Sequence, residues 1–197
     1  MQDLPQEIAM TAARLVVEEG MEYGPAKRRA VKQLGLPART ALPDNVLLES
    51  EVREYIDIFC GETQSLELRA LRELALVWMQ RLQAYRPYLG GAVWHGTATR
   101  LSDIYLQLFC DDAKSIEIEL INQGQHYSPS TVTGLHGEPV EALSLHSHCV
   151  GLGEIVGVHL IIYDYDDVRG ALKPDAQGRS PRGNLAAITI LLDEKDA

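Results

Sequence analysis

The residues from Pro87 to Lys114 constrain the fold more than any other stretch of the chain. They read as an apolar strand (Tyr88–Trp94), a turn of small residues (Gly96–Thr99) and a second apolar strand (Ile104–Cys110) that follows Asp103. A glycine lets backbone N–H groups approach a phosphate closely, and a carboxylate at the start of a strand is a potential Mg²⁺ ligand. The pattern predicts either a phosphate-and-metal site or, with equal weight, an ordinary strand connection carrying one polar aspartate.

Composition narrows the class of protein. The chain has 197 residues, of which 46% are hydrophobic and 23% charged, as in a soluble globular protein with a core. A net charge of −10 argues against nucleic-acid binding over the whole surface but leaves a local basic patch open. Three cysteines without a CxxC motif predict a reducing compartment. With no signal peptide and no apolar run of roughly 20 residues, we expect a cytoplasmic protein that does not contact a membrane.

Helical spacing of apolar residues predicts about four helices before Pro87. Gly20 should end the first and Asp44 should cap the third, whereas Ser65 should cap the fourth. The predicted helices are residues 4–19, 25–34, 46–59 and 66–85. We therefore expect a helical region over residues 1–86 and a second domain over residues 87–197.

The second predicted helix is strongly basic on an acidic chain. It carries Lys27, Arg28, Arg29 and Lys32, while Ala30 and its apolar neighbours can form a buried side. The simpler interpretation is a solvated face. The alternative is a surface for an anionic partner such as RNA or a nucleotide, or for a protein partner.

The remainder of the chain alternates strands with short helices. Asp111 and Asp112 stand where carboxylates would cap a helix, and Ser180-Pro181 has the form of a helix start. The predicted strands are residues 126–132, 140–149 and 155–165, and the predicted helices are 113–122, 166–172 and 180–192. The expected class is α+β, with a helical N-terminal region followed by a mixed or antiparallel sheet and flanking helices.

Side chains alternate along a strand, so Asp103 and Tyr105 share one face of the strand that follows the small-residue turn. A two-metal site for phosphoryl transfer needs carboxylates at both of these positions and a third from a neighbouring strand. Tyr105 is a poor Mg²⁺ ligand. The third position falls on the 155–165 strand, where His159 lies in the middle and Asp164 near the end. The carboxylate set is incomplete.

The segment WHGTATRLSDIYLQLF resembles the signature of the polymerase-beta-like nucleotidyltransferase superfamily. Gly96-Thr97 corresponds to its Gly-Ser pair, Arg100 to a basic linker residue, and Ser102-Asp103 to the start of its Ser-Asp-x-Asp run. The chain also resembles a bacterial group that joins a helical N-terminal region to such a domain, through AKRRAVKQLGLP, ALPDN and PRGNLAAITILL. The resemblance implies a nucleotidyltransferase-like sheet, a nucleoside triphosphate held by Gly96, Thr97, Arg100 and Ser102, and Mg²⁺ held by Asp103.

The sequence departs from this signature in two ways, because Tyr105 stands in place of the second aspartate and the linker is shortened. These departures leave two candidate functions. The favoured one is a degenerate nucleotidyltransferase-like protein that binds a nucleotide or serves as an interaction module. The alternative is an active Mg²⁺-dependent enzyme that transfers a nucleotidyl group to an acceptor, with Asp103 as the retained metal ligand and Asp164 assisting. The oligomeric state stays open.

Weaker candidates lie elsewhere in the C-terminal half. His146, His148 and His159 could form a zinc site if their strands align, although histidines at i and i+2 are common without metal. Arg169, Arg179 and Arg182 could clamp a phosphate, although an exposed loop explains them as well. The chain has neither a Walker A loop nor a Gly-x-Ser-x-Gly elbow, so a P-loop NTPase is unsupported and we do not expect a serine hydrolase.

Overall fold

The computed structural model describes residues 3–194. Contacts divide the chain into two compact units, one comprising Met1–Glu67 with Thr97–Leu101 and the other comprising Leu68–Gly96 with Ser102–Ala197. The domain boundary that the sequence predicts before Pro87 stays a prediction, and by contacts most of the fourth helix belongs to the second unit. Among the described residues, no helix is both long enough and apolar enough to cross a membrane.

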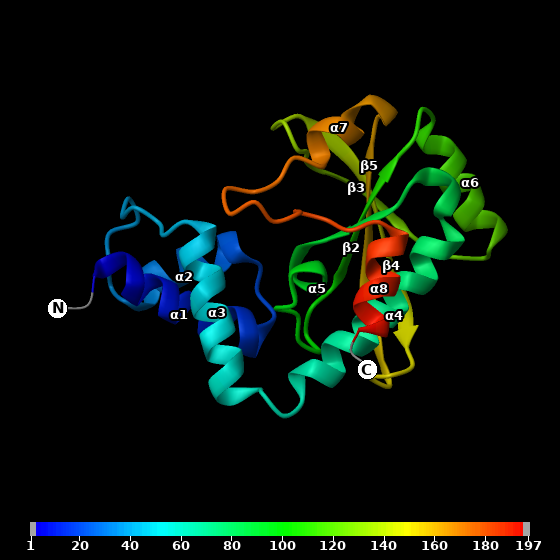
Figure 1. The fold of residues 1–197 in the computed structure, drawn as a ribbon. Helices are drawn as coiled ribbons and strands as arrows, with labels where there is room; N and C mark the ends of the chain where they lie inside the picture. Colours follow the sequence, from blue (N-terminus) through cyan, green and yellow to red (C-terminus); the bar gives the residue numbers. More distant parts are fainter. Residues whose placement is uncertain (1–2, 195–197) are drawn as a thin grey trace. The chain divides into compact units, whose positions relative to one another are not determined.

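The first unit is built on α1 (Leu4–Glu19), α2 (Tyr23–Gln33) and α3 (Asn45–Phe59), all shown in Figure 1. Small residues such as Ala12 and Ala30 are fully buried, which allows the helices to approach one another closely. Gly20 ends α1 with a left-handed φ of 67°. The Asp44 carboxylate accepts a hydrogen bond of 2.8 Å from the Leu47 N–H, which confirms the predicted cap of α3.

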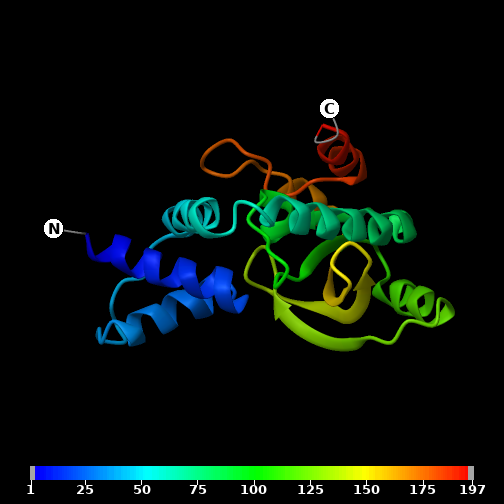
Figure 2. The ribbon, with the colours of Figure 1, turned by 90° about the horizontal axis from the view of Figure 1, so that it is seen from below.

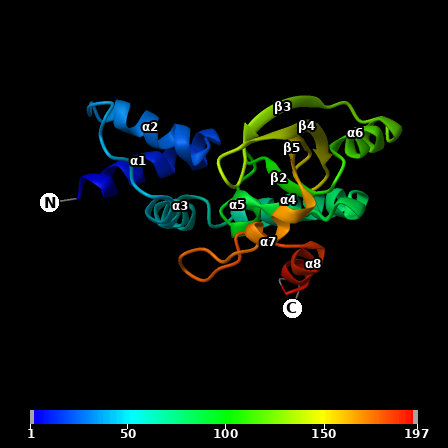
Figure 3. The same cartoon turned by 90° about the horizontal axis from the view of Figure 1, so that it is seen from above.

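The second unit is a five-stranded sheet with flanking helices, so the expected α+β class is confirmed. The strand order is β1-β2-β5-β4-β3, and Figure 3 shows it from β3 through β4 and β5 to β2. Strands β2 and β5 run parallel, and the other neighbours are antiparallel. The strands are β1 (Tyr88–Gly90), β2 (Ile104–Phe109), β3 (Ser128–Thr133), β4 (Pro139–Cys149) and β5 (Glu154–Tyr163). The helical segments are α4 (Gln64–Arg81), η1 (Gln83–Tyr85), α5 (Gly91–His95), α6 (Ala113–Asn122), η2 (Tyr165–Asp167), α7 (Val168–Ala171) and α8 (Leu185–Asp193).

One face of the sheet is a buried apolar layer against α4, which Figure 2 shows lying along the sheet. Every second residue of β2 from Ile104 and of β5 from Val156 is buried on this face, and Leu106 and Leu160 are fully buried. From α4, the buried Trp78 donates its indole N–H to the Ser147 hydroxyl over 3.0 Å. This face supplies most of the apolar burial that stabilises the unit.

The opposite face of the sheet has two parts. At the carboxyl ends of β2 and β5, Phe109 and Tyr163 stack with ring centroids 5.4 Å apart, and Ala171 of α7 covers them. Towards the amino ends of the same strands, this face holds partly exposed polar side chains around Asp103 and, at the start of β5, the exposed Ile155. The candidate site lies in this polar part.

Several predicted elements begin or end at other residues in the structure. Strand β1 ends at Gly90, because Gly91 has a φ of 65° and starts the short helix α5. The fourth helix starts at Gln64, so Ser65 lies inside it rather than at its cap, and it ends at Arg81. The last helix starts at Leu185 after an Asn184 cap, not at Ser180, and β5 ends at Tyr163 rather than Tyr165.

The late start of α8 has a structural reason. The Leu89 and Gly183 backbones exchange two hydrogen bonds, of 2.8 and 2.9 Å, and form a β-bridge at the edge of β1. Gly183 is therefore held at the sheet edge, and Pro181 and Arg182 before it form bends instead of a helical turn. Helix α6 spans the predicted residues, and the Asp112 carboxylate accepts from the Lys114 N–H over 3.0 Å, as predicted for a cap.

Candidate functional site

Asp103 immediately precedes β2 and faces β5 across a glycine. The parallel register pairs Ile104 with Val158, which places Asp103 beside Gly157. A Cβ atom added at Gly157 would lie 2.7 Å from the Asp103 carboxylate carbon, so only glycine leaves room for this side chain. The Gly157 N–H donates to Asp103 Oδ1 over 3.2 Å. Backbone and side chain together fix the carboxylate against β5.

A chain of hydrogen bonds crosses three strands from this carboxylate. His159 of β5 is 3.0 Å from Asp103 through Nε2 and Oδ2, and 2.8 Å from the Ser144 hydroxyl of β4 through Nδ1. The antiparallel register aligns Ser144 with His159, and the parallel register aligns His159 with Tyr105. The Tyr105 ring stacks on the imidazole with centroids 4.8 Å apart. Both ring nitrogens of His159 therefore have hydrogen-bond partners, and one face of the ring is stacked on Tyr105.

The electrostatics of the site keep Asp103 ionised. The hydrogen bond from His159 lowers the pKa of the Asp103 carboxyl, burial opposes this, and the His159 charge, the Gly157 N–H and His146 lower it further. An ionised carboxylate only accepts hydrogen bonds, so Nε2 of His159 carries the proton of the Asp103–His159 bond. In the neutral form of the imidazole, His159 Nδ1 then accepts a hydrogen bond from the Ser144 O–H. The side chains of His159 and Asp103 are 24% and 45% exposed, so the chain is open to solvent.

The residues at these positions do not fit a pair of Mg²⁺ ions. Mg²⁺ demands octahedral oxygen ligands, mostly carboxylates and water, and the three positions of the motif hold one carboxylate, a phenol and an imidazole. Asp164 follows the end of β5 and precedes η2, five residues beyond His159 and on the order of 16 Å along a strand. Within residues 3–194, no three His, Cys, Asp or Glu side chains lie together so that they could hold a metal ion.

The other residues that the sequence nominates for phosphate binding are placed as follows. Gly96 ends α5 with a φ of 86° and donates its N–H to the Ala92 carbonyl over 2.9 Å. Thr97 is buried, and its hydroxyl has no hydrogen-bond partner within the described part of the chain. The Arg100 N–H donates to Glu67 over 2.9 Å, and Ser102 is partly buried. By contacts, Thr97 and Arg100 belong to the first unit, and Gly96 and Ser102 to the second.

The basic residues of α2 are partly occupied by internal contacts. Lys27 Nζ donates to the Pro43 carbonyl and to the Asn45 side chain, each over 2.9 Å. Arg29 forms an ion pair with Glu19, while Arg28 and Lys32 are exposed. These contacts account for two of the four charges as structural, and a partner for this helix stays a prediction.

The histidine and arginine candidates are also placed. His146 and His148 point to the same face of β4 as Ser144, opposite Gly157 and Ile155 of β5, and both are exposed. Arg179 pairs with Asp175 over 2.9 Å, and Arg169 is exposed on α7. Arg182 is half-buried with its Nε unpartnered among the described residues, and burial lowers the pKa of its guanidinium.

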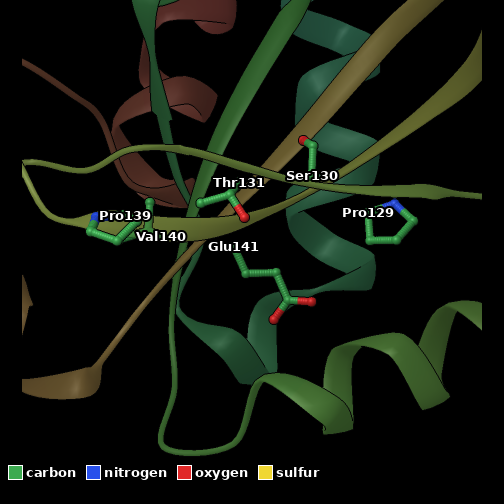
Figure 4. Close-up of a pocket in the computed structure, with 6 residues that line it drawn as sticks. All are labelled: Pro129, Ser130, Thr131, Pro139, Val140 and Glu141. Carbon is green, nitrogen blue, oxygen red and sulfur yellow. The ribbon is translucent and has the colours of Figure 1, made fainter.

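An open groove lies on the β3–β4 hairpin and involves none of the nominated residues (Figure 4). Its lining comes from facing positions of the two strands, with Thr131 paired to Glu141. The lining residues are Pro129, Ser130, Thr131, Pro139, Val140 and Glu141.

Sequence reasoning missed Ser144 and Gly157 as members of the site. The alternation of Ser144, His146 and His148 was visible in the sequence, but the register of β4 against β5 was not. That register decides which side chain of β4 meets His159. A glycine inside an otherwise β-branched strand was the available signal for the close approach of Asp103.

Comparisons with known proteins identify no family. No family model matches the chain, and no curated protein matches it. One matching solved structure is the Cid1 poly(U) polymerase with MgGTP bound, at TM-score 0.36 and 15% identity, covering 56% of this chain and 38% of that one. Another is a cytoplasmic RNA terminal U-transferase, at TM-score 0.36 and 19% identity, covering 56% and 36%. This chain therefore matches little more than a third of either protein, and a TM-score this low identifies neither a family nor an activity.

Proposed function

We propose that this chain is a nucleotidyltransferase-like protein that binds a nucleotide without metal-dependent transfer. The observation that carries the proposal is that the Asp103 carboxylate is already hydrogen-bonded within the protein. The carboxylate in the position of the family's first metal ligand is held by His159 and by the Gly157 N–H, over 3.0 and 3.2 Å. Tyr105 and His159 fill the positions where the motif needs further carboxylates. The motif resemblance supports the nucleotide-binding part, with Gly96, Thr97, Arg100 and Ser102 as proposed phosphate-binding residues.

The negative charge of Asp103 affects nucleotide affinity in a direction that depends on whether a metal ion is bound. Without a metal ion between them, an ionised carboxylate and a triphosphate repel each other, by roughly 1 kcal/mol for unit charges 4 Å apart in water. With a bridging Mg²⁺, the same carboxylate would instead attract the metal–nucleotide complex. Neutralising Asp103 therefore has opposite effects on nucleotide affinity in the degenerate protein and in an active enzyme.

The test is a titration of wild type and Asp103→Asn with each of the four nucleoside triphosphates, with and without Mg²⁺. We expect one nucleotide to bind wild type without Mg²⁺, and to bind Asp103→Asn equally or up to about fivefold more tightly. Asn keeps the shape of the side chain, and Asp112→Asn serves as a matched control at a helix cap. Binding that requires Mg²⁺ and weakens in Asp103→Asn would overturn the proposal in favour of an active Mg²⁺-dependent nucleotidyltransferase.

The phosphate-binding residues are tested one by one in the same assay. Thr97→Val removes a buried hydroxyl without changing the size of the side chain, and Arg100→Gln removes an exposed charge. We expect both variants to lose nucleotide affinity while they retain the wild-type melting temperature without ligand. Unchanged affinity in both would remove this segment from the site.

A further inference from the structure

The hydrogen-bonded chain Asp103–His159–Ser144 has the connectivity of an activated serine. A carboxylate lies within hydrogen-bond distance of one nitrogen of an imidazole, and a serine hydroxyl lies within hydrogen-bond distance of the other. In the neutral imidazole whose Nε2 carries the proton, Nδ1 accepts from the serine hydroxyl. In serine hydrolases this order makes the imidazole a general base toward the hydroxyl, and the carboxylate stabilises the imidazolium that forms. Here Nδ1 faces the serine and Nε2 the carboxylate, the reverse of chymotrypsin-type triads, and either imidazole nitrogen can accept a proton.

The surroundings hold this chain in place. Tyr105 stacks on the His159 ring, and the Gly157 N–H holds the Asp103 carboxylate, so neither partner is free to rotate away. All three side chains come from neighbouring strands of one sheet within one unit, which fixes their spacing through the register. Ser144 itself is only partly buried.

We infer that Ser144 is a nucleophile toward small neutral acyl esters, an activity independent of the nucleotide binding proposed above. A neutral ester suits the site, because the Asp103 carboxylate disfavours anionic substrates and its hydrogen-bond partners are His159 and the Gly157 N–H rather than a lysine or arginine. Ser144 lies within a strand rather than on a Gly-x-Ser-x-Gly elbow, which is why its sequence context gives no signal.

The reaction is balanced without a cofactor. Ser144 Oγ bonds to the ester carbonyl carbon while its proton passes to His159 Nδ1. The carbon–oxygen bond to the alcohol then breaks, and the alcohol leaves with that proton. Water, deprotonated by the same nitrogen, next attacks the acyl-serine and releases the carboxylic acid, which restores the Ser144 hydroxyl. The overall change is ester plus water to acid plus alcohol.

The experiment uses p-nitrophenyl acetate on the full chain. We expect a burst of p-nitrophenolate and one added acetyl group per chain, located on Ser144 by peptide mass spectrometry. Ser144→Ala should lose both the burst and the adduct. Ser147→Ala, on the same strand but facing α4, is the matched control and should keep them.

Substitutions at His159 and Asp103 test whether Ser144 reacts because it is activated or only because its hydroxyl is exposed. His159→Gln should slow acylation by about 100-fold or more, in the range of general-base catalysis, and Asp103→Asn by a smaller factor. If His159→Gln fails to fold, as judged by circular dichroism, Asp103→Asn decides the question. An acetyl group found elsewhere than on Ser144, or acylation of Ser144 at the wild-type rate in the folded base variants, would overturn the inference.

Discussion

The two faces of the central sheet differ in what their residues do, although both come from the same strands. On the face against α4, Leu106 and Leu160 are fully buried and the polar groups serve packing, as Trp78 and Ser147 do. On the opposite face, the residues beside them, Tyr105 and His159, are partly exposed and hydrogen-bonded or stacked around Asp103. Successive residues of one strand therefore have different roles, since one side chain packs in the core and the next lies in the candidate site.

The largest expected loss of stability comes from a substitution on the buried face. Leu106→Ala removes a fully buried side chain, and we expect it to lower the free energy of unfolding by about 2–5 kcal/mol because a cavity remains. Gln107→Ala, the next residue on the opposite face, should cost about 1 kcal/mol or less. Urea unfolding of both variants measures the difference. Equal losses would mean that both faces contribute to the core.

Two serines on β4 sharpen the comparison. Ser147→Ala leaves the indole N–H of Trp78 buried without a partner, and we expect a loss of about 1–3 kcal/mol. Ser144→Ala leaves His159 Nδ1 open to water, so the loss should be at most about 1 kcal/mol. The same urea titration compares them. A Ser144→Ala variant less stable than Ser147→Ala would show that the polar chain serves the fold first.

Acid sensitivity gives the smallest effect. The pKa of Asp103 is lowered below its usual 3.8, chiefly by His159, so its ionised form stabilises the folded state above about pH 4. That stability is lost as the pH falls through the lowered pKa. Wild type should therefore lose more unfolding free energy between pH 6 and about pH 3 than Asp103→Asn does. Parallel pH profiles for the two proteins would contradict the ion pair.

The sequence predicted the elements of the fold better than their partners. Local signals identified α1, α6 and the caps at Asp44 and Asp112, because these depend on neighbours within a few residues. Local signals failed at Ser180-Pro181, because a long-range bridge holds Gly183 against Leu89 and the helix starts only after it, at Leu185. A cap motif cannot compete with a pairing that the sequence does not reveal.

The site divides in the same way. The proximity of Asp103, Tyr105 and His159 could be predicted, because strand alternation puts the first two on one face and because His159 lies in the middle of the most β-branched strand. Their role in binding stays a prediction. Ser144 depends on the offset of β4 against β5, which the sequence does not encode locally. Two predictions remain as the sequence made them. One is that phosphate binds to Gly96, Thr97, Arg100 and Ser102, and the other is that a partner binds to Lys27, Arg28, Arg29 and Lys32.

The central claim is that the polar face of this sheet does not assemble a metal–nucleotide complex. Electron paramagnetic resonance of Mn²⁺, used in place of Mg²⁺ with each nucleoside triphosphate, tests it without any acceptor. The account predicts the same Mn²⁺–nucleotide spectrum in the presence of wild type and in the presence of Asp103→Asn. A protein-bound Mn²⁺ signal in wild type that Asp103→Asn abolishes would contradict it, and would mean that Asp103 gives up His159 to hold a catalytic metal.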